Sequence, residues 1–284
     1  MNKKARKRII IISIILILYL LIPFCNNPLS DFITRREVEN YLEENYSGMG
    51  YEIESRGYNF LESNYRYTVS VPGSKDDYFN IHIKKYGGIY LDGYKDAQKH
   101  GIYEAQRNAS QRLYSEYDRC VEDALDINEI LVSGQSYGNV YGTFEFSTKK
   151  EYEEYDHIPD YVIFYDDLTA DKEYNIKELG KNHGRVIISI QHEENISYRR
   201  AAEILLWAKE KLDNAGIGCY CIYISLRTPP SGEYGEAQYT DPYIAVNDFL
   251  YTEITEENLA KRVEENYKAY LTSTGDPLTY FGEE

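Results

Sequence analysis

The residues Gly134-Gln135-Ser136-Tyr137-Gly138 match the G-x-S-x-G pattern that holds the nucleophile in many hydrolases. In those enzymes a strand leads into the pattern and a helix follows it, which presents the serine hydroxyl for attack. Here we expect the reverse, a helix before the pattern and a strand after it. Asp166 and His192 follow in the chain order of a Ser-Asp-His triad, but an acid-rich chain meets that order easily. We interpret the segment as a glycine-rich turn, with a serine hydrolase using Ser136 as the alternative.

Histidine and acidic residues do not predict a metal site. His192 opens a segment that begins like the zinc motif H-E-x-x-H, but Ile196 stands where the second imidazole must be. His82 alternates onto the polar face of a predicted strand, where we expect it to be exposed. The acids between Glu151 and Asp171 match no calcium-loop spacing, and a charge run usually forms a solvated face. We assign no catalytic, cofactor-binding or metal-binding residue and expect no cofactor.

The cysteines do not define a disulfide framework. Cys219 and Cys221 share one face of a predicted strand, which places their sulfurs about 6–7 Å apart, too far to pair. A bridge from Cys120 to either of them stays open. The segment 227–243 is rich in Pro, Gly and Tyr, and we interpret it as an irregular connection, with a ligand-gripping loop as the alternative.

The charge balance excludes nucleic acid as a partner. The 284 residues include 31 Lys and Arg against 47 Asp and Glu, a net charge of −16. Binding to phosphates needs basic patches that an acidic chain lacks. The chain also has 31 Tyr and 1 Trp, and tyrosine suits contact surfaces because it offers apolar area with a polar tip.

The N-terminal segment predicts a membrane anchor. Residues 1–8 are basic, and an uncharged run from Ile9 to Phe24 follows. With Cys25 included, residues 9–25 reach a length that spans the bilayer, and the basic start favours a cytoplasmic N-terminus. We therefore expect a single-pass protein of the cell membrane, with the lipid bilayer as a partner and extracellular domains. Signal cleavage or lipidation at Cys25 stays as an alternative, although Phe24 is not the small residue that either needs.

After a linker at residues 26–33, residues 34–103 predict one helix and an antiparallel meander. Thr34 and Glu37 have the spacing of a capping box, so we expect the helix to start at Arg35 and to stop at Gly48. Alternating apolar residues then predict strands at 65–71, 79–84 and 89–91, and Gly87-Gly88 predicts the last hairpin.

Residues 104–284 predict a second α+β domain. Ser197 and Gly216 bound one of its helices, and Thr255 is expected to cap the last one. The strands at 186–190 and 220–226 flank a helix long enough for a crossover, so they are expected to be parallel. The predicted elements are a helix at 104–125, strands at 140–146, 161–165, 185–191 and 219–226, and helices at 197–215 and after 255. The fold class is thus α+β, an N-terminal transmembrane helix followed by two small helix-plus-sheet domains with antiparallel or mixed strands.

These features together resemble the YfjL-like family, a group of uncharacterised membrane-anchored proteins of Gram-positive bacteria. The likeness rests on the basic start and apolar span, on Lys85-Tyr86-Gly87-Gly88-Ile89-Tyr90, on the helix with Arg112-Leu113-Tyr114-Ser115-Glu116-Tyr117, and on the block from Arg185 to Leu226. It implies a pair of small extracytoplasmic α+β domains and supplies no catalytic residue. The first domain also resembles PepSY-type and cystatin-like modules, which are often inhibitory or binding units.

The sequence favours a non-enzymatic binding or accessory module. Its expected partner is a protein, a peptide or a cell-wall component, and the alternative is the hydrolase at Ser136. An accessory subunit of a larger membrane complex is a third possibility.

Overall fold

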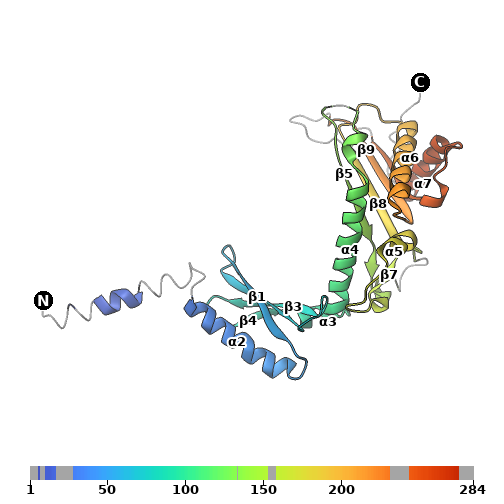
Figure 1. Ribbon diagram of the computed structural model, residues 1–284. Helices are drawn as coiled ribbons and strands as arrows, with labels where there is room; N and C mark the ends of the chain where they lie inside the picture. The colour runs from blue at the N-terminus through green and yellow to red at the C-terminus, as the bar shows by residue number, and fades with distance from the viewer. Residues whose placement is uncertain are drawn as a thin grey trace. The chain divides into compact units, whose positions relative to one another are not determined.

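The chain forms two α+β units, each with its own four-stranded sheet (Figure 1). The computed structural model describes residues 6, 10–16, 28–132, 134–152, 158–230 and 243–274. The first unit comprises residues 1–109 and 168–172, and the second comprises 110–167 and 173–284. The expected boundary at 103/104 thus falls just before the division at 109/110, which lies inside helix α4 (Glu104–Ala124).

The predicted anchor lies mostly outside the described residues. Residues 10–16 are helical with exposed side chains, while residues 9 and 17–25 are not described. Within the described part of the chain, no helix is both long and apolar enough to cross a membrane.

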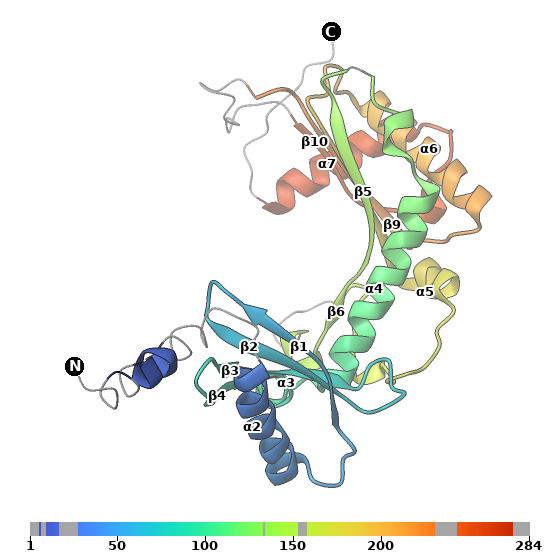
Figure 2. The same cartoon turned by 60° about the vertical axis from the view of Figure 1, so that its left-hand side comes forward.

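The first unit is a helix on an antiparallel sheet. Its sheet has the order β1-β2-β3-β4, so β1 and β4 are edge strands. Helix α2 runs along one face of this sheet (Figure 2). The elements are α2 (Pro28–Tyr46), β1 (Glu52–Asn59), β2 (Asn64–Ser70), β3 (Tyr78–Lys84), β4 (Ile89–Asp92) and α3 (Gly93–Lys99).

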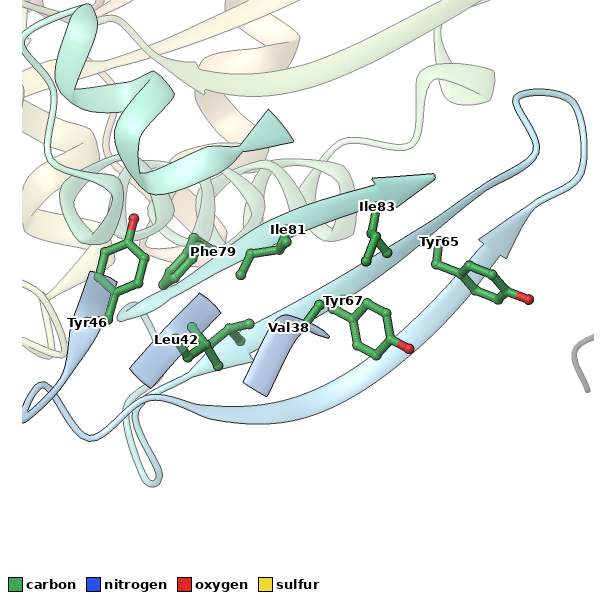
Figure 3. Packing of buried hydrophobic residues seen from close by; sticks show 9 residues of the cluster. Val38, Leu42, Tyr46, Tyr65, Tyr67, Phe79, Ile81 and Ile83 are labelled. Atoms are coloured by element: carbon green, nitrogen blue, oxygen red, sulfur yellow. The ribbon is translucent and has the colours of Figure 1, made fainter. Parts of the chain in front are cut away.

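One core forms between α2 and the sheet (Figure 3). Its apolar residues recur at every second position of β2 and β3 and at helical spacing in α2. Every second residue of β2 and β3 is buried against α2. Burying a large apolar side chain stabilises by about 1.5–3 kcal/mol, so this alternation fixes which face of the sheet the helix covers. The cluster comprises Val38, Leu42, Tyr46, Tyr65, Tyr67, Val69, Phe79, Ile81 and Ile83.

The predicted start of this helix at Arg35 is wrong. Helix α2 begins at Pro28, inside the expected linker, where proline's fixed φ suits a first helical turn. The Thr34 hydroxyl donates to the Ser30 carbonyl (2.7 Å) and also bonds the Tyr67 hydroxyl (2.7 Å), so it caps nothing. Glu37 accepts from the backbone N–H of Gly88 (2.7 Å) instead. The predicted stop is confirmed, because the helix ends at Tyr46 and Gly48 has φ +83°.

A reciprocal contact, the Asp76–Asp171 clasp, ties residues 168–172 to the turn before β3. The Asp171 carboxylate accepts from Ser74 Oγ (3.0 Å) and from the N–H groups of Lys75 (2.6 Å) and Asp76 (3.0 Å). The Asp171 N–H donates to Asp76 Oδ2 (2.8 Å), and Asp76 is fully buried. Asp171, which belongs to the acidic run that the sequence predicts to be a solvated face, therefore stabilises the fold.

Asp171→Ala is expected to destabilise the chain by about 1–2 kcal/mol, because it removes the acceptor of three donors. Urea unfolding measures the change. Asp167→Ala, at an exposed acid four residues earlier, is the control and should have almost no effect. Equal midpoints for the two variants would show that the clasp contributes nothing.

The second unit has a mixed sheet in the order β10-β9-β8-β5. Strands β8 and β9 are parallel, as predicted, with helix α6 as their crossover, and the outer pairs are antiparallel. Its strands are β5 (Tyr137–Phe144), β6 (Phe146–Ser147), β7 (Ile163–Phe164), β8 (Gly184–Gln191), β9 (Cys221–Arg227) and β10 (Tyr243–Leu250), and its helices are α5 (Ile176–His183), α6 (Tyr198–Ala215) and α7 (Leu259–Thr274), besides most of α4.

Two predictions in this unit need correction. The strand expected at 161–165 is reduced to the two residues of β7, which pair in parallel with β6. The last helix begins at Leu259 rather than beside Thr255, whose carbonyl and hydroxyl oxygens accept from the Arg262 guanidinium. Helix α6 is confirmed, with Ser197 at its N-cap and Gly216 (φ +64°) at its end.

Helix α7 covers the outer edge of β10. The Asn266 amide donates to the Asn247 carbonyl (2.9 Å) and accepts from the Asn247 N–H (2.8 Å). Tyr267 donates to the Tyr243 carbonyl (2.9 Å) and lies in a cluster with Ala245 and Leu271. These contacts satisfy backbone groups that an edge strand otherwise leaves open.

Candidate functional site

The Ser136 side chain is engaged in a structural hydrogen bond. Its hydroxyl donates to the backbone carbonyl of His192 (3.0 Å), and the His192 ring packs against Tyr137 instead. Asp166 lies in a separate 3-10 turn, where it pairs with Lys149 (3.8 Å). The turn leads into β5, which confirms the predicted turn-to-strand order. The three residues therefore do not assemble a triad.

Ser136→Ala is expected to cost about 1 kcal/mol of stability, the contribution of one hydrogen bond, and to change no chemistry. We expect a fluorophosphonate probe to leave Ser136 unlabelled in the full chain. Labelling that disappears in Ser136→Ala would support the hydrolase alternative.

The other residues considered for chemistry are dispersed. Cys120, Cys219 and Cys221 are free thiols, and burial raises the pKa of Cys221 to about 12, so it stays protonated. His82 is half-buried with a lowered pKa, because desolvation and Arg66 disfavour its charged form. Across the described ranges no three His, Cys, Asp or Glu side chains gather as metal ligands. Residues 231–242 of the considered loop are not described.

The first unit has a groove between α2 and β1, the α2–β1 groove. Its volume is about 650 Å³. One wall is a stripe of α2 at helical spacing, and the other is the turn after α2 with the start of β1. The lining residues are Arg35, Glu39, Leu42, Glu43, Tyr46, Ser47, Gly48, Gly50, Tyr51, Glu52 and Ile53.

Two tyrosine rings, each fixed by a hydrogen bond from its hydroxyl to a carboxylate, line part of this groove. The rings of Tyr46 and Tyr51 meet edge to face, with centroids 5.8 Å apart. Tyr46 donates its hydroxyl to Asp92 Oδ2 (2.6 Å), and Tyr51 donates to Asp77 Oδ1 (2.7 Å). Burial, followed by the carboxylate acceptors, raises the pKa of both phenols well above its usual range, so both stay neutral. The ring positions are thus fixed before any ligand arrives.

The rim of the groove is acidic. One base stands against three acids in the lining, a net charge of −2. Arg35 is already paired with Glu39 (3.0 Å), and both side chains are exposed. Glu43 and Glu52 are exposed on the two opposite walls. The groove therefore presents negative charge on both of its walls.

The strand wall has an open side. Among the described strands, β1 pairs with β2 alone, so its other side faces outward at the edge of the sheet. A bulge between Ile53 and Ser55 interrupts the register beside the groove. Bulges at sheet edges re-aim side chains and often accompany binding sites.

Sequence reasoning did not find this groove, because its walls lack a sequence signal. Strand β1 alternates poorly, with mostly exposed residues, and was not predicted. Glu39 and Glu43 look like an ordinary solvated helix face. The apolar stripe of α2 predicts that Leu42 and Tyr46 face the core. It does not predict that these two residues also line a groove.

Comparison with known proteins gives the family. The model of the YfjL-like N-terminal domain matches residues 1–93, and that of the YfjL-like C-terminal domain matches residues 124–264. The chain belongs to the YfjL-like family. The α2–β1 groove lies in the YfjL-like N-terminal domain, and Ser136 lies in the YfjL-like C-terminal domain. No curated protein and no solved structure matches significantly.

Proposed function

We propose that this YfjL-like chain is a membrane-anchored, extracytoplasmic binding module without catalytic activity, and that its N-terminal domain captures an extended basic peptide in the α2–β1 groove. The observation that carries the proposal is an acidic groove, with the half-buried Tyr51 and Ile53 in its lining, whose wall is an open edge strand. The anchor at residues 9–25 rests on the basic start and the apolar run of the sequence.

An edge strand beside a helix favours recognition by strand addition. In this mode the peptide backbone bonds the open side of the strand, and alternate side chains enter the groove. Here the half-buried Tyr51 and Ile53 offer apolar area to side chains that point inward, while Leu42 and Tyr46 are buried in the core. A groove of 650 Å³ has room for a few such side chains but not for a folded domain.

The acidic rim selects the charge of the peptide. Glu43 and Glu52 on opposite walls attract Lys or Arg, and the net charge of −16 repels acidic chains over longer distances. Complementary charge contributes most to the rate of association and to specificity.

The test uses the full chain in detergent and a fluorescent seven-residue peptide of alternating Lys and Val. Saturable binding is expected, and a Glu-Val peptide should not bind. Glu43→Lys is expected to weaken binding about tenfold, equivalent to about 1.4 kcal/mol. Glu44→Lys is the matched control, because Glu44 is also exposed on α2 but does not line the groove.

Backbone N-methylation of the peptide at alternate residues tests strand addition separately. It removes N–H donors and keeps every side chain, so binding should be lost. Equal effects of Glu43→Lys and Glu44→Lys would refute the groove as the site. Full binding of the N-methylated peptide would refute strand addition.

A further inference from the structure

Exposed apolar side chains gather at one end of the first unit, the end at which α2 begins after the predicted anchor. Phe32 and Ile33, in the first turns of α2, are 62% and 49% exposed. Phe60 and Leu61, in the β1–β2 hairpin, are 68% and 98% exposed. Leaving apolar side chains of this size in water is unfavourable, and a group of them marks a contact surface.

Several contacts hold the two pairs at the same end of the unit. Asp31, next to Phe32, pairs with Arg56 of β1 (2.6 Å). The Arg56 guanidinium lies over the Tyr65 ring, 5.4 Å from its centroid, and the Tyr65 hydroxyl bonds Ser30 of α2. Both views show the hairpin beside the first turns of α2 (Figures 1 and 2).

The hairpin tip has a defined shape. Asn59 Oδ1 accepts from the N–H groups of Leu61 (3.0 Å) and Glu62 (3.3 Å), and the Phe60 ring packs on Tyr58 at 4.8 Å. The Glu62 carboxylate, the acid beside Leu61, accepts from the Asn64 amide (2.7 Å). An ordered tip presents Phe60 and Leu61 without a further loss of backbone entropy on contact.

We propose that Phe32, Ile33, Phe60 and Leu61 form a lipid-contacting surface that seats the first unit on the bilayer. The inference rests on the proposed anchoring. Only three residues, 25–27, separate Phe24, the end of the apolar run, from Pro28, the start of α2. The four steps from residue 24 to residue 28 reach about 14 Å at most, so an inserted run holds this end of α2 next to the headgroups. Apolar side chains there enter the headgroup–acyl boundary.

The same surface leaves the groove accessible. Helix α2 has 19 residues and is about 28 Å long, with Phe32 near its start and Tyr46, in the groove, at its end. The groove lining runs along α2 from Arg35 to Tyr46, so seating the first turns of α2 on lipid leaves the Tyr46 end of the groove at the far end of the helix.

The test uses the full chain in phosphatidylcholine vesicles, in a Trp207→Phe background that removes the single natural tryptophan. New tryptophans are placed one at a time, as Leu61→Trp at the hairpin tip, Met49→Trp after the end of α2, and Leu16→Trp in the apolar run. Brominated phosphatidylcholine, which quenches tryptophan within the bilayer, is the probe. Leu61→Trp should lose emission roughly twofold and Met49→Trp should not.

Leu16→Trp separates the two proposals. Quenching at 16 without quenching at 61 would overturn the lipid-contacting surface and leave the anchor in place. Absence of quenching at 16 would overturn the anchor and, with it, this inference. Equal quenching at 61 and 49 would show that the domain lies flat on lipid, which also contradicts the proposal.

Discussion

Gly184→Ala is expected to destabilise the second unit by about 3 kcal/mol, because a Cβ at this position would lie 2.5 Å from Cζ of Tyr117 and 2.7 Å from the Gly180 carbonyl oxygen. Tyr117 is fully buried, and its hydroxyl donates to the Gly218 carbonyl (3.1 Å). The φ of Gly184 is −74°, which any residue adopts, so the effect is steric. Urea unfolding followed by circular dichroism measures it.

A second substitution tests whether the Tyr117 ring causes the loss of stability in Gly184→Ala. Tyr117→Leu removes the ring end that meets the new methyl group, so Gly184→Ala should cost less in that background than in the natural chain, and the remaining cost is the contact with the Gly180 carbonyl. Gly134→Ala is the control, because a Cβ there has no atom within 4 Å. Strictly additive losses for the two substitutions would contradict the explanation.

Arg200→Met is expected to cost about 3–5 kcal/mol at neutral pH, because it leaves the Glu193 carboxylate buried without its counter-charge. Glu193 is fully buried, and Arg200 Nε lies 3.7 Å from its Oε1. Neither Glu193 oxygen has a hydrogen bond of ordinary geometry within the described part of the chain. Arg199→Met, at a side chain that is 87% exposed, is the control and should change little.

The pH dependence of this loss distinguishes charge from packing. Burial raises the pKa of Glu193, and Arg200 opposes the rise. A carboxyl with a raised folded-state pKa contributes stability below its unfolded pKa, and that contribution is lost as pH rises through the folded pKa. The cost of Arg200→Met should therefore be small near pH 4 and grow toward neutral pH. Glu193→Gln should recover most of the loss, whereas a loss independent of pH would indicate packing alone.

The sequence predicts those helices and strands whose own residues show apolar periodicity or capping residues. Strands β2 and β3 alternate strictly, and Ser197 and Gly216 bound α6 by local capping, so the predicted bounds of these elements agree with the structure within one residue. The parallel pairing of β8 and β9 followed from the length of their connection. The order of these elements and their apolar spacing also indicate the YfjL-like family, which the family models confirm.

Other features depend on contacts between distant residues. Thr34 has the spacing of a capping residue, but its hydroxyl bonds Tyr67 across the core, which no local pattern encodes. Strand β10 was missed, and its ladder is broken by a bulge at which Asp248 has φ +44°. The α2–β1 groove can be predicted only if β1 is known to lie at the sheet edge. That position follows from the strand order and not from the residues of β1.

The acids of β1 also govern how copies of the chain meet one another. Glu52 and Glu54 are exposed on the open edge strand, whereas β10 relies on the Asn266 amide to occupy its edge. Two copies that approached through β1 would bring like charges together, and this repulsion disfavours fibril-type stacking. Copies of the chain would thus stay separate at high concentration, whereas a chain of opposite charge would meet no such repulsion at this edge.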